Sequence, residues 1–131
     1  MKKQTQNIKL LLVEDNKGDA RLIEELLVEA EETAHFELVI VESLGEALRH
    51  LNENSFDSVL LDLGLPDSQG LDTLSKVLTK APNVPVVVLT GLADEQASAE
   101  ALRMGANDYL VKGRVDSNVL VRAMLYAVRP K

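Results

Sequence analysis

The sequence predicts an α/β fold in which one parallel β-sheet carries helices on both faces, an arrangement called doubly wound. Five short runs rich in Val, Ile and Leu recur along the chain at intervals of roughly 20 to 30 residues. The runs do not alternate between apolar and polar residues, as is typical of strands buried on both faces. Each segment between them has apolar residues at helical spacing. Repeated strand–helix–strand units imply right-handed crossovers, with helices on both faces of one sheet.

The five apolar runs are the predicted strands. We expect strands over residues 8–13, 36–41, 58–61, 84–89 and 109–111. Periodicity alone would also allow each run to be part of a buried helix. The segments between the runs decide the matter, because each has the pattern of a helix with one apolar side.

The first two intervening segments predict amphipathic helices. In the first, glutamates fill the positions between the members of an apolar stripe made of Leu22, Ile23, Leu26, Leu27 and Ala30. The second opens with Ser43 and has Glu46 three residues later, which is the pattern of a capping box at a helix N-terminus. Its apolar side consists of Leu44, Ala47, Leu48 and Leu51.

Three further helices are predicted after residue 70. The third has a stripe of Leu71, Leu74, Val77 and Leu78. It should end near Ala81, because Pro82 disfavours helical geometry in the residue before it. The fourth begins near Asp94, ends at Gly105, and has a small contact face made of Ala97, Ala101 and Met104. The last runs from Asp116 or Ser117 to Val128.

Composition limits the classes of function. A chain of 131 residues predicts one domain, which we place at 8–128, after a polar leader at 1–7 and before a tail at 129–131. It has no Cys, which excludes disulfides and thiolate metal sites. No apolar stretch is long enough for a membrane span, so we expect a cytoplasmic protein without a membrane partner. A net charge of −7, no Trp, two Phe and two Tyr argue against direct binding of nucleic acid.

Polar residues that suit one chemical site follow the first, third, fourth and fifth predicted strands. They are Glu14 and Asp15, then Asp62, Thr90 and Lys112. Taken singly, each has an ordinary explanation: an Asp after a strand often forms a turn, a Thr often begins a loop, and a Lys is often a solvated charge. In a doubly wound sheet, however, the carboxyl ends of the strands meet at one edge, where ligands bind. We therefore expect these five side chains to form one cluster.

Such a cluster predicts a divalent cation and phosphoryl chemistry. Three neighbouring carboxylates repel one another by about 2 to 4 kcal/mol per pair, and one Lys cannot neutralise all three. All-oxygen ligation suits Mg²⁺, with Mn²⁺ as a second candidate. A cation site beside a hydroxyl and an ammonium group matches phosphoryl transfer. Asp62 is the expected nucleophile, because it lies on the central strand and a loop rich in Gly and Pro follows it.

Four motifs together resemble the receiver domains of two-component response regulators. They are "LLVEDN", "LLDLGLPDSQG", "VVVLTG" and "DYLVKG", and the resemblance covers residues 8–128. It implies a flavodoxin-like sheet with strand order 2-1-3-4-5 and five flanking helices. It also implies a signalling domain that is no enzyme beyond its own phosphorylation and dephosphorylation.

The resemblance assigns a role to each residue of the cluster. Asp62 would be the phosphoacceptor. Mg²⁺ would be bound by Asp15, Asp62 and the backbone carbonyl of Gly64, and Glu14 would hold the ion through water. Thr90 and Lys112 would bind the phosphoryl group. Tyr109 would be the aromatic residue that swings inward on activation.

The same resemblance implies the partners. A histidine kinase or a phosphotransfer protein would donate the phosphoryl group. An output domain or target protein would bind the surface formed by the helices at 94–104 and 116–128 and the strand at 109–111. A homodimer is a further partner that the resemblance allows.

Two positions depart from the family pattern. Gly113 follows Lys112 where Pro is common, and a cis bond without Pro costs about 2.5 to 4 kcal/mol, so we expect a trans bond. Gly64 and Leu92, each two residues past a site residue, have no side chain that could orient water. We therefore expect self-dephosphorylation to proceed without side-chain help from either position.

Two other classes of protein share part of this pattern. Haloacid-dehalogenase-type phosphatases also use an Asp nucleophile and Mg²⁺, but they have a second Asp at the position that Gly64 occupies here. A docking module of the same fold would bind its partner without phosphorylation, but it would not need all the acids together with Thr90 and Lys112. The two histidines, His35 and His50, are expected on the surface.

Overall fold

The computed structural model describes residues 6–30, 34–91 and 93–129, and it confirms the predicted parallel sheet. The sheet has the order β2-β1-β3-β6-β7, which is 2-1-3-4-5 when only its own strands are counted. Its strands are β1 (Gln6–Val13), β2 (Ala34–Val41), β3 (Ser58–Leu61), β6 (Val86–Thr90) and β7 (Asp108–Val111). All four neighbouring pairs are parallel.

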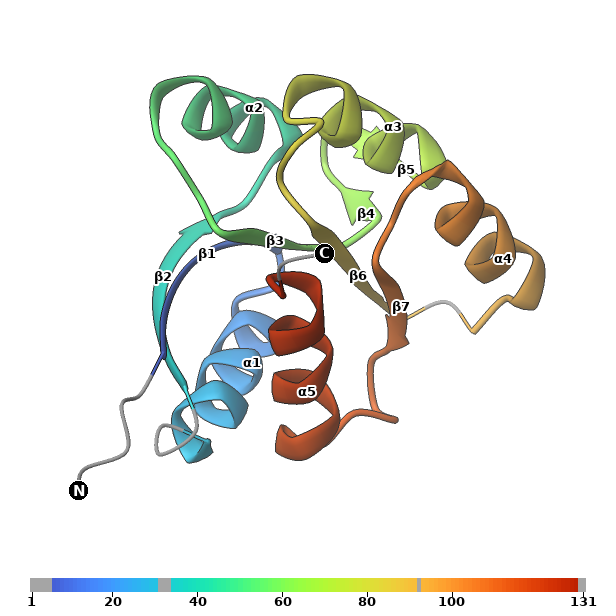
Figure 1. Ribbon diagram of the computed structural model, residues 1–131. Coiled ribbons are helices and arrows are strands. Elements are labelled where there is room, and N and C mark those ends of the chain that lie inside the picture. Colours follow the sequence, from blue (N-terminus) through green and yellow to red (C-terminus); the bar gives the residue numbers. More distant parts are fainter. Residues whose placement is uncertain (1–5, 31–33, 92, 130–131) are drawn as a thin grey trace.

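Helices cover both faces of the sheet. Figure 1 shows α1 and α5 together on one face and α2, α3 and α4 on the other. Their bounds are α1 (Lys17–Glu29), α2 (Leu44–Glu53), α3 (Leu71–Lys80), α4 (Glu95–Met104) and α5 (Ser117–Ala127). Helices on both faces of a parallel sheet confirm the doubly wound prediction.

None of the helices in the described part of the chain is long and apolar enough to cross a membrane.

The strands supply a core to each face because successive side chains of a strand point to opposite sides. In β1, Leu10 and Leu12 pack toward α1 and α5, whereas Leu11 and Val13 pack toward the other three helices. Leu60 of β3 belongs to the first core and its neighbours in that strand to the second. This explains why the strand sequences are apolar throughout.

The helix ends follow the signals in the sequence. The Ser43 hydroxyl accepts a hydrogen bond from the Glu46 N–H at 3.2 Å, which confirms the predicted N-cap of α2. The side chain of Asp94 caps α4, and Gly105 ends that helix with a φ of 125°. Ala101 is the only residue of α4 that is fully buried, in agreement with the small contact face expected for this helix.

The strand bounds differ from the predicted ones by a few residues. β1 begins at Gln6, within the predicted leader, and β2 begins at Ala34. β6 begins at Val86, because Pro85 has no N–H to donate to the sheet. It ends at Thr90, one residue beyond the predicted end. The rest of the predicted leader, residues 1–5, and residues 130–131 of the predicted tail lie outside the described part.

A small hairpin after β3 was not predicted. β4 (Gly64–Leu65) and β5 (Ser68–Gln69) pair antiparallel in the segment for which the sequence predicts a loop. Strands of two residues are too short to show a periodic pattern. At the tip of the hairpin, Asp67 accepts hydrogen bonds from the backbone N–H groups of Leu44 and Gly45, at 2.8 and 2.9 Å. These bonds hold the pKa of Asp67 below its usual value and fix the hairpin to the start of α2.

The packing of α3 predicts a stability difference between two leucines. Leu74 is fully buried, whereas Leu22 on α1 is 55% exposed. Replacing Leu74 by Ala should lower the free energy of unfolding by about 2 to 5 kcal/mol, because it leaves a cavity. Leu22→Ala should change it by less than about 0.5 kcal/mol. Urea denaturation of both variants measures the difference, and equal losses would contradict this packing.

Candidate functional site

The sheet's hydrogen bonds continue one residue beyond the strand ends, and this fixes three site residues. The backbone N–H groups of Glu14, Asp62 and Lys112 each donate to a carbonyl of the neighbouring strand. The bonds are Glu14 N to Val41 O at 2.9 Å, Asp62 N to Val13 O at 3.0 Å and Lys112 N to Thr90 O at 2.8 Å. The three residues therefore start from backbone positions that the sheet holds, at the carboxyl ends of β1, β3 and β7.

The ammonium group of Lys112 connects the acids of the site. Its Nζ lies 2.5 Å from Glu14 Oε1, 2.9 Å from Asp19 Oδ2 and 3.0 Å from Asp62 Oδ2. An ammonium group has three N–H donors, so each carboxylate can receive one. Lys112 thereby links the ends of β1 and β3 to the start of α1.

Asp62 is held at both of its oxygens. Its Oδ1 accepts a hydrogen bond from the Gly64 N–H at 3.2 Å, and its Oδ2 faces Lys112. The residue is 8% exposed. One carboxylate oxygen is therefore held by the backbone of the hairpin that follows Asp62, and the other by the ammonium group of Lys112.

The start of α1 is fixed to the same site. Glu14 is 1% exposed, and its Oε2 accepts a hydrogen bond from the Asn16 N–H at 3.1 Å. The Asn16 side chain caps α1 by accepting from the Asp19 N–H at 2.9 Å. The local sequence "EDNKGD" thus supplies the buried acid Glu14, the exposed acid Asp15, the helix cap Asn16 and a third acid, Asp19, within six residues.

Three carboxylates form a group that fits a divalent cation. Glu14, Asp15 and Asp62 each offer one oxygen, and these oxygens lie within 4.8 Å of one another. Asp15 is exposed, whereas the other two are buried. Mg²⁺ prefers oxygen ligands and keeps several waters, so one exposed and two buried carboxylates suit it. The predicted convergence of the acids is confirmed in the structure.

The charges shift the pKa values of two residues. Burial raises the pKa of Glu14 to about 7, and the negative charge of Asp62 adds to this, although hydrogen bonds from Lys112 and the Asn16 N–H oppose it. Burial by itself would lower the pKa of Lys112. Its contacts with Glu14, Asp19 and Asp62 outweigh burial and hold its pKa above the usual value. The amine is therefore protonated at neutral pH.

Thr90 and Tyr109 lie on the neighbouring strands β6 and β7. Thr90 is the last residue of β6 and is 5% exposed, and its carbonyl holds the backbone of Lys112. Tyr109 of β7 is half-buried and packs against the core under α2, α3 and α4. Burial, followed by the negative charge of Asp94, raises the pKa of Tyr109. Asp94 is the N-cap of α4, so Tyr109 lies near the start of that helix.

Asp19 is a site residue that the sequence analysis missed. It lies in the first turn of α1, three residues after the N-cap Asn16. The helix dipole alone favours an Asp in the first turn of a helix, so the sequence gives no separate reason to expect its contact with Lys112.

The backbone after Lys112 accommodates the missing proline. The described residues contain no cis peptide bond, so the Lys112–Gly113 bond is trans as predicted. Gly113 has a φ of 85°, which glycine adopts readily. Of the two positions without a water-orienting side chain, Gly64 is exposed, and Leu92 lies outside the described residues.

The histidines differ from each other in exposure. His35 is exposed, as predicted. His50 is only partly exposed, and its ring meets the Phe56 ring edge-on at 6.5 Å, so its prediction as a surface residue was incomplete.

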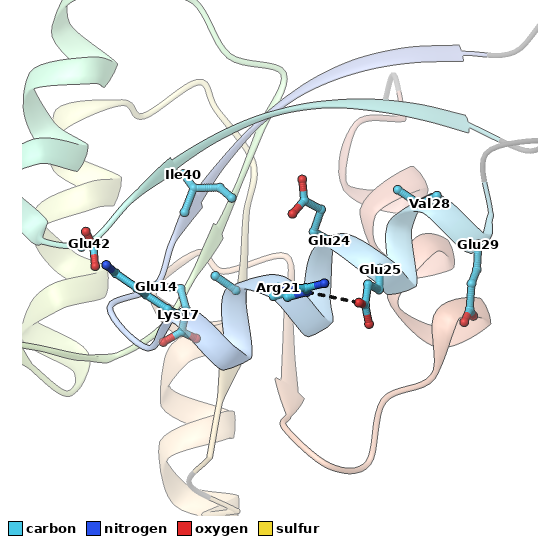
Figure 2. A pocket seen from close by; sticks show the side chains of 10 residues that line it. Glu14, Lys17, Arg21, Glu24, Glu25, Val28, Glu29, Ile40 and Glu42 are labelled. Carbon is cyan, nitrogen blue, oxygen red and sulfur yellow. Dashed lines mark hydrogen bonds and ion pairs between the residues drawn. The ribbon is translucent and has the colours of Figure 1, made fainter.

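A groove of about 850 Å³ runs beside the site, between α1 and β2. Figure 2 shows its lining, in which Ile40 and Val28 stand among several glutamates and Arg21 pairs with Glu25. Glu14 lines both this groove and the site, whereas Asp62 and Lys112 do not line the groove. Of the acids that contact Lys112, Glu14 alone lines this groove.

The raised pKa of Glu14 predicts how stability depends on pH. Between pH 4.5 and about 7 the folded protein holds a proton that the unfolded chain has released, so this group's contribution to stability is lost as pH rises. Glu14→Gln removes the effect while keeping an acceptor for Lys112. The unfolding free energy of the variant minus that of the wild type should increase by about 1 to 3 kcal/mol from pH 5 to pH 8. Denaturation with a chelator present measures it, and parallel pH curves would contradict it.

Comparison with known proteins agrees with this geometry. The family model described as "Response regulator receiver domain" matches residues 10–124. The transcriptional regulatory protein CpxR of Escherichia coli K12 is 35% identical over 114 residues, which cover 87% of this chain and 47% of CpxR. The chain thus spans about half the length of this curated relative.

Two solved structures have the same fold. The receiver domain of the sensor histidine kinase PA1611 from Pseudomonas aeruginosa, with a magnesium ion coordinated in its active-site cleft, is 26% identical with a TM-score of 0.77. The alignment covers 93% of this chain and 98% of that one. The phosphorylated cyanobacterial phytochrome response regulator RcpA is 29% identical, with a TM-score of 0.71 and coverage of 90% and 89%. The chain belongs to the family of response regulator receiver domains.

Proposed function

We propose that this receiver domain accepts a phosphoryl group on Asp62 from a histidine kinase or a phosphotransfer protein. The supporting observation is the position of the Asp62 carboxylate, which lies 3.0 Å from the Lys112 ammonium and within the group of three acids. An Asp62 oxygen would form a bond to phosphorus while the bond between phosphorus and the donor imidazole nitrogen breaks. The electron pair of the broken bond stays on that nitrogen.

The acids provide ligands for the metal that such a reaction uses. Mg²⁺, or Mn²⁺ in its place, would be held by Asp15, Asp62 and the Gly64 carbonyl, with Glu14 reached through water. The bound ion would neutralise charge on the phosphoryl group. The all-oxygen donor set supports this assignment, and the related PA1611 domain is described with magnesium in its cleft.

Lys112 and Thr90 would bind the phosphoryl oxygens. Lys112 already faces the Asp62 oxygen at which the new bond would form, and its raised pKa keeps it cationic. Thr90 lies at the end of the neighbouring strand, joined to Lys112 through the backbone. Lys112 would act by its position and charge, and Thr90 by a hydrogen bond from its neutral hydroxyl; positioning and charge stabilisation supply most of the catalysis in phosphoryl transfer.

Phosphorylation would change the surface formed by α4, β7 and α5. The added charge would draw the Thr90 hydroxyl toward the phosphoryl group, and Tyr109 would move into the space that it leaves. α4 is a suitable element to shift, because only Ala101 of this helix is fully buried. The surface also exposes apolar side chains that a target protein, an output domain or a second copy would cover. They are Leu102, Val119 and Tyr126.

Phosphorylation of the isolated chain tests the proposed acceptor. Incubation with acetyl phosphate and Mg²⁺ should add one acid-labile phosphoryl group, measured by intact-protein mass spectrometry. Asp62→Asn should lose essentially all of it. Asp72→Asn, which removes an exposed carboxylate on α3, should keep it. Equal labelling of the wild type and Asp62→Asn would exclude Asp62 as the acceptor, and an unlabelled wild type would favour a docking module instead.

Amide hydrogen exchange tests the switch. With beryllium fluoride and Mg²⁺ present, amides of α4 should exchange at rates that differ several-fold from those in the free protein, because the helix has little buried surface to hold it. Amides of β1, in the centre of the core, should be unaffected. Unchanged exchange throughout α4 would count against the proposed movement.

A further inference from the structure

The contact between Asp19 and Lys112 has no role in the proposed phosphotransfer. Asp19 is not among the three acids that could hold a metal ion. Its Oδ2 nevertheless lies 2.9 Å from the Lys112 Nζ, as close as the Asp62 oxygen at 3.0 Å. The amine that would bind the phosphoryl group is therefore shared with a residue outside the reaction.

The three partners of Lys112 differ in how easily they can leave. The Glu14 side chain is 1% exposed and that of Asp62 is 10% exposed, whereas that of Asp19 is 41% exposed. Glu14 and Asp62 start from backbone positions fixed by the sheet. Asp19 is on the first turn of α1 and is the only one of the three whose carboxylate water can readily solvate when the contact breaks.

We propose that Asp19 is a positioning residue that acts through Lys112, directing one of its N–H groups away from Asp62 and so weakening the hold on a bound phosphoryl group. This inference rests on the proposed function. Asp19 also places a negative charge next to the amine that the anionic phosphoryl group must approach, and the two negative charges repel. Asp19 thus makes the phosphorylated state less stable.

Removal of Asp19 leaves Lys112 in place. The contact with buried Glu14 at 2.5 Å remains, as does the backbone bond from Lys112 N to Thr90 O at 2.8 Å. Loss of Asp19 therefore frees an N–H donor without freeing the side chain. Replacing Asp19 should therefore tighten the binding of a phosphoryl group. Replacing a residue that supports the structure of the site would weaken this binding.

Titration with beryllium fluoride in the presence of Mg²⁺ tests this. Calorimetry should show that Asp19→Asn binds beryllium fluoride about 2- to 5-fold more tightly than the wild type, the range expected for a partly exposed ion pair. The difference should shrink in high salt. Asp19→Glu should restore wild-type affinity. Glu24→Gln removes the same charge from α1 without a contact to Lys112, and it should match the wild type.

Mg²⁺ binding without beryllium fluoride provides the second measurement. Its dissociation constant should change less than about twofold in Asp19→Asn, because Asp19 offers no ligand to the ion, and a general loss of structure would weaken both. Equal or weaker beryllium fluoride binding by Asp19→Asn would overturn the proposal. A tightening that Glu24→Gln reproduces would also overturn it. If the wild type binds Mg²⁺ but no beryllium fluoride and accepts no phosphoryl group, the proposed function itself fails.

Discussion

The contact of one ammonium group with three carboxylates is the interaction on which the rest of the site depends. The Lys112 Nζ lies within 3.0 Å of carboxylate oxygens of Glu14, Asp19 and Asp62, and each of these residues is at least 50 positions away from Lys112 in the sequence. One positive charge offsets the repulsion among these acids only in part, and Asp15 adds a further negative charge nearby. Burial, with the negative charge of Asp62 adding to it, raises the pKa of Glu14. The excess of negative charge makes the site suitable for a divalent cation.

The sheet makes this unfavourable concentration of charge possible. Glu14 and Asp62 directly follow two adjacent central strands, and each continues the hydrogen bonding of the sheet by one residue. The apolar strands below them pack on both faces and provide the stability that the acids do not. The charged groups are thus held by their backbones, so their side chains can exchange partners without loss of the fold.

The parts of this structure that follow from periodicity and strand ends could be predicted from the sequence. Glu14, Asp62 and Lys112 were predictable neighbours because parallel strands bring their carboxyl ends to one edge. Asp19 was not, because its role comes from the direction of a single side chain on α1. The β4–β5 hairpin and the Asp67 contact with α2 also depend on tertiary contacts that segments of two residues do not reveal. Sequence patterns thus predict where backbones converge better than which side chains then meet.

Anomalous diffraction from crystals grown with Mn²⁺ would test the central claim most directly. The excess of negative charge around Lys112 predicts one strong peak among the carboxylates of Glu14, Asp15 and Asp62. A competing acidic region exists in the groove between α1 and β2, where Glu24 and Glu42 stand. A peak in that groove with none beside Asp62 would show that the acids around Lys112 are already satisfied by the amine, and would contradict the account.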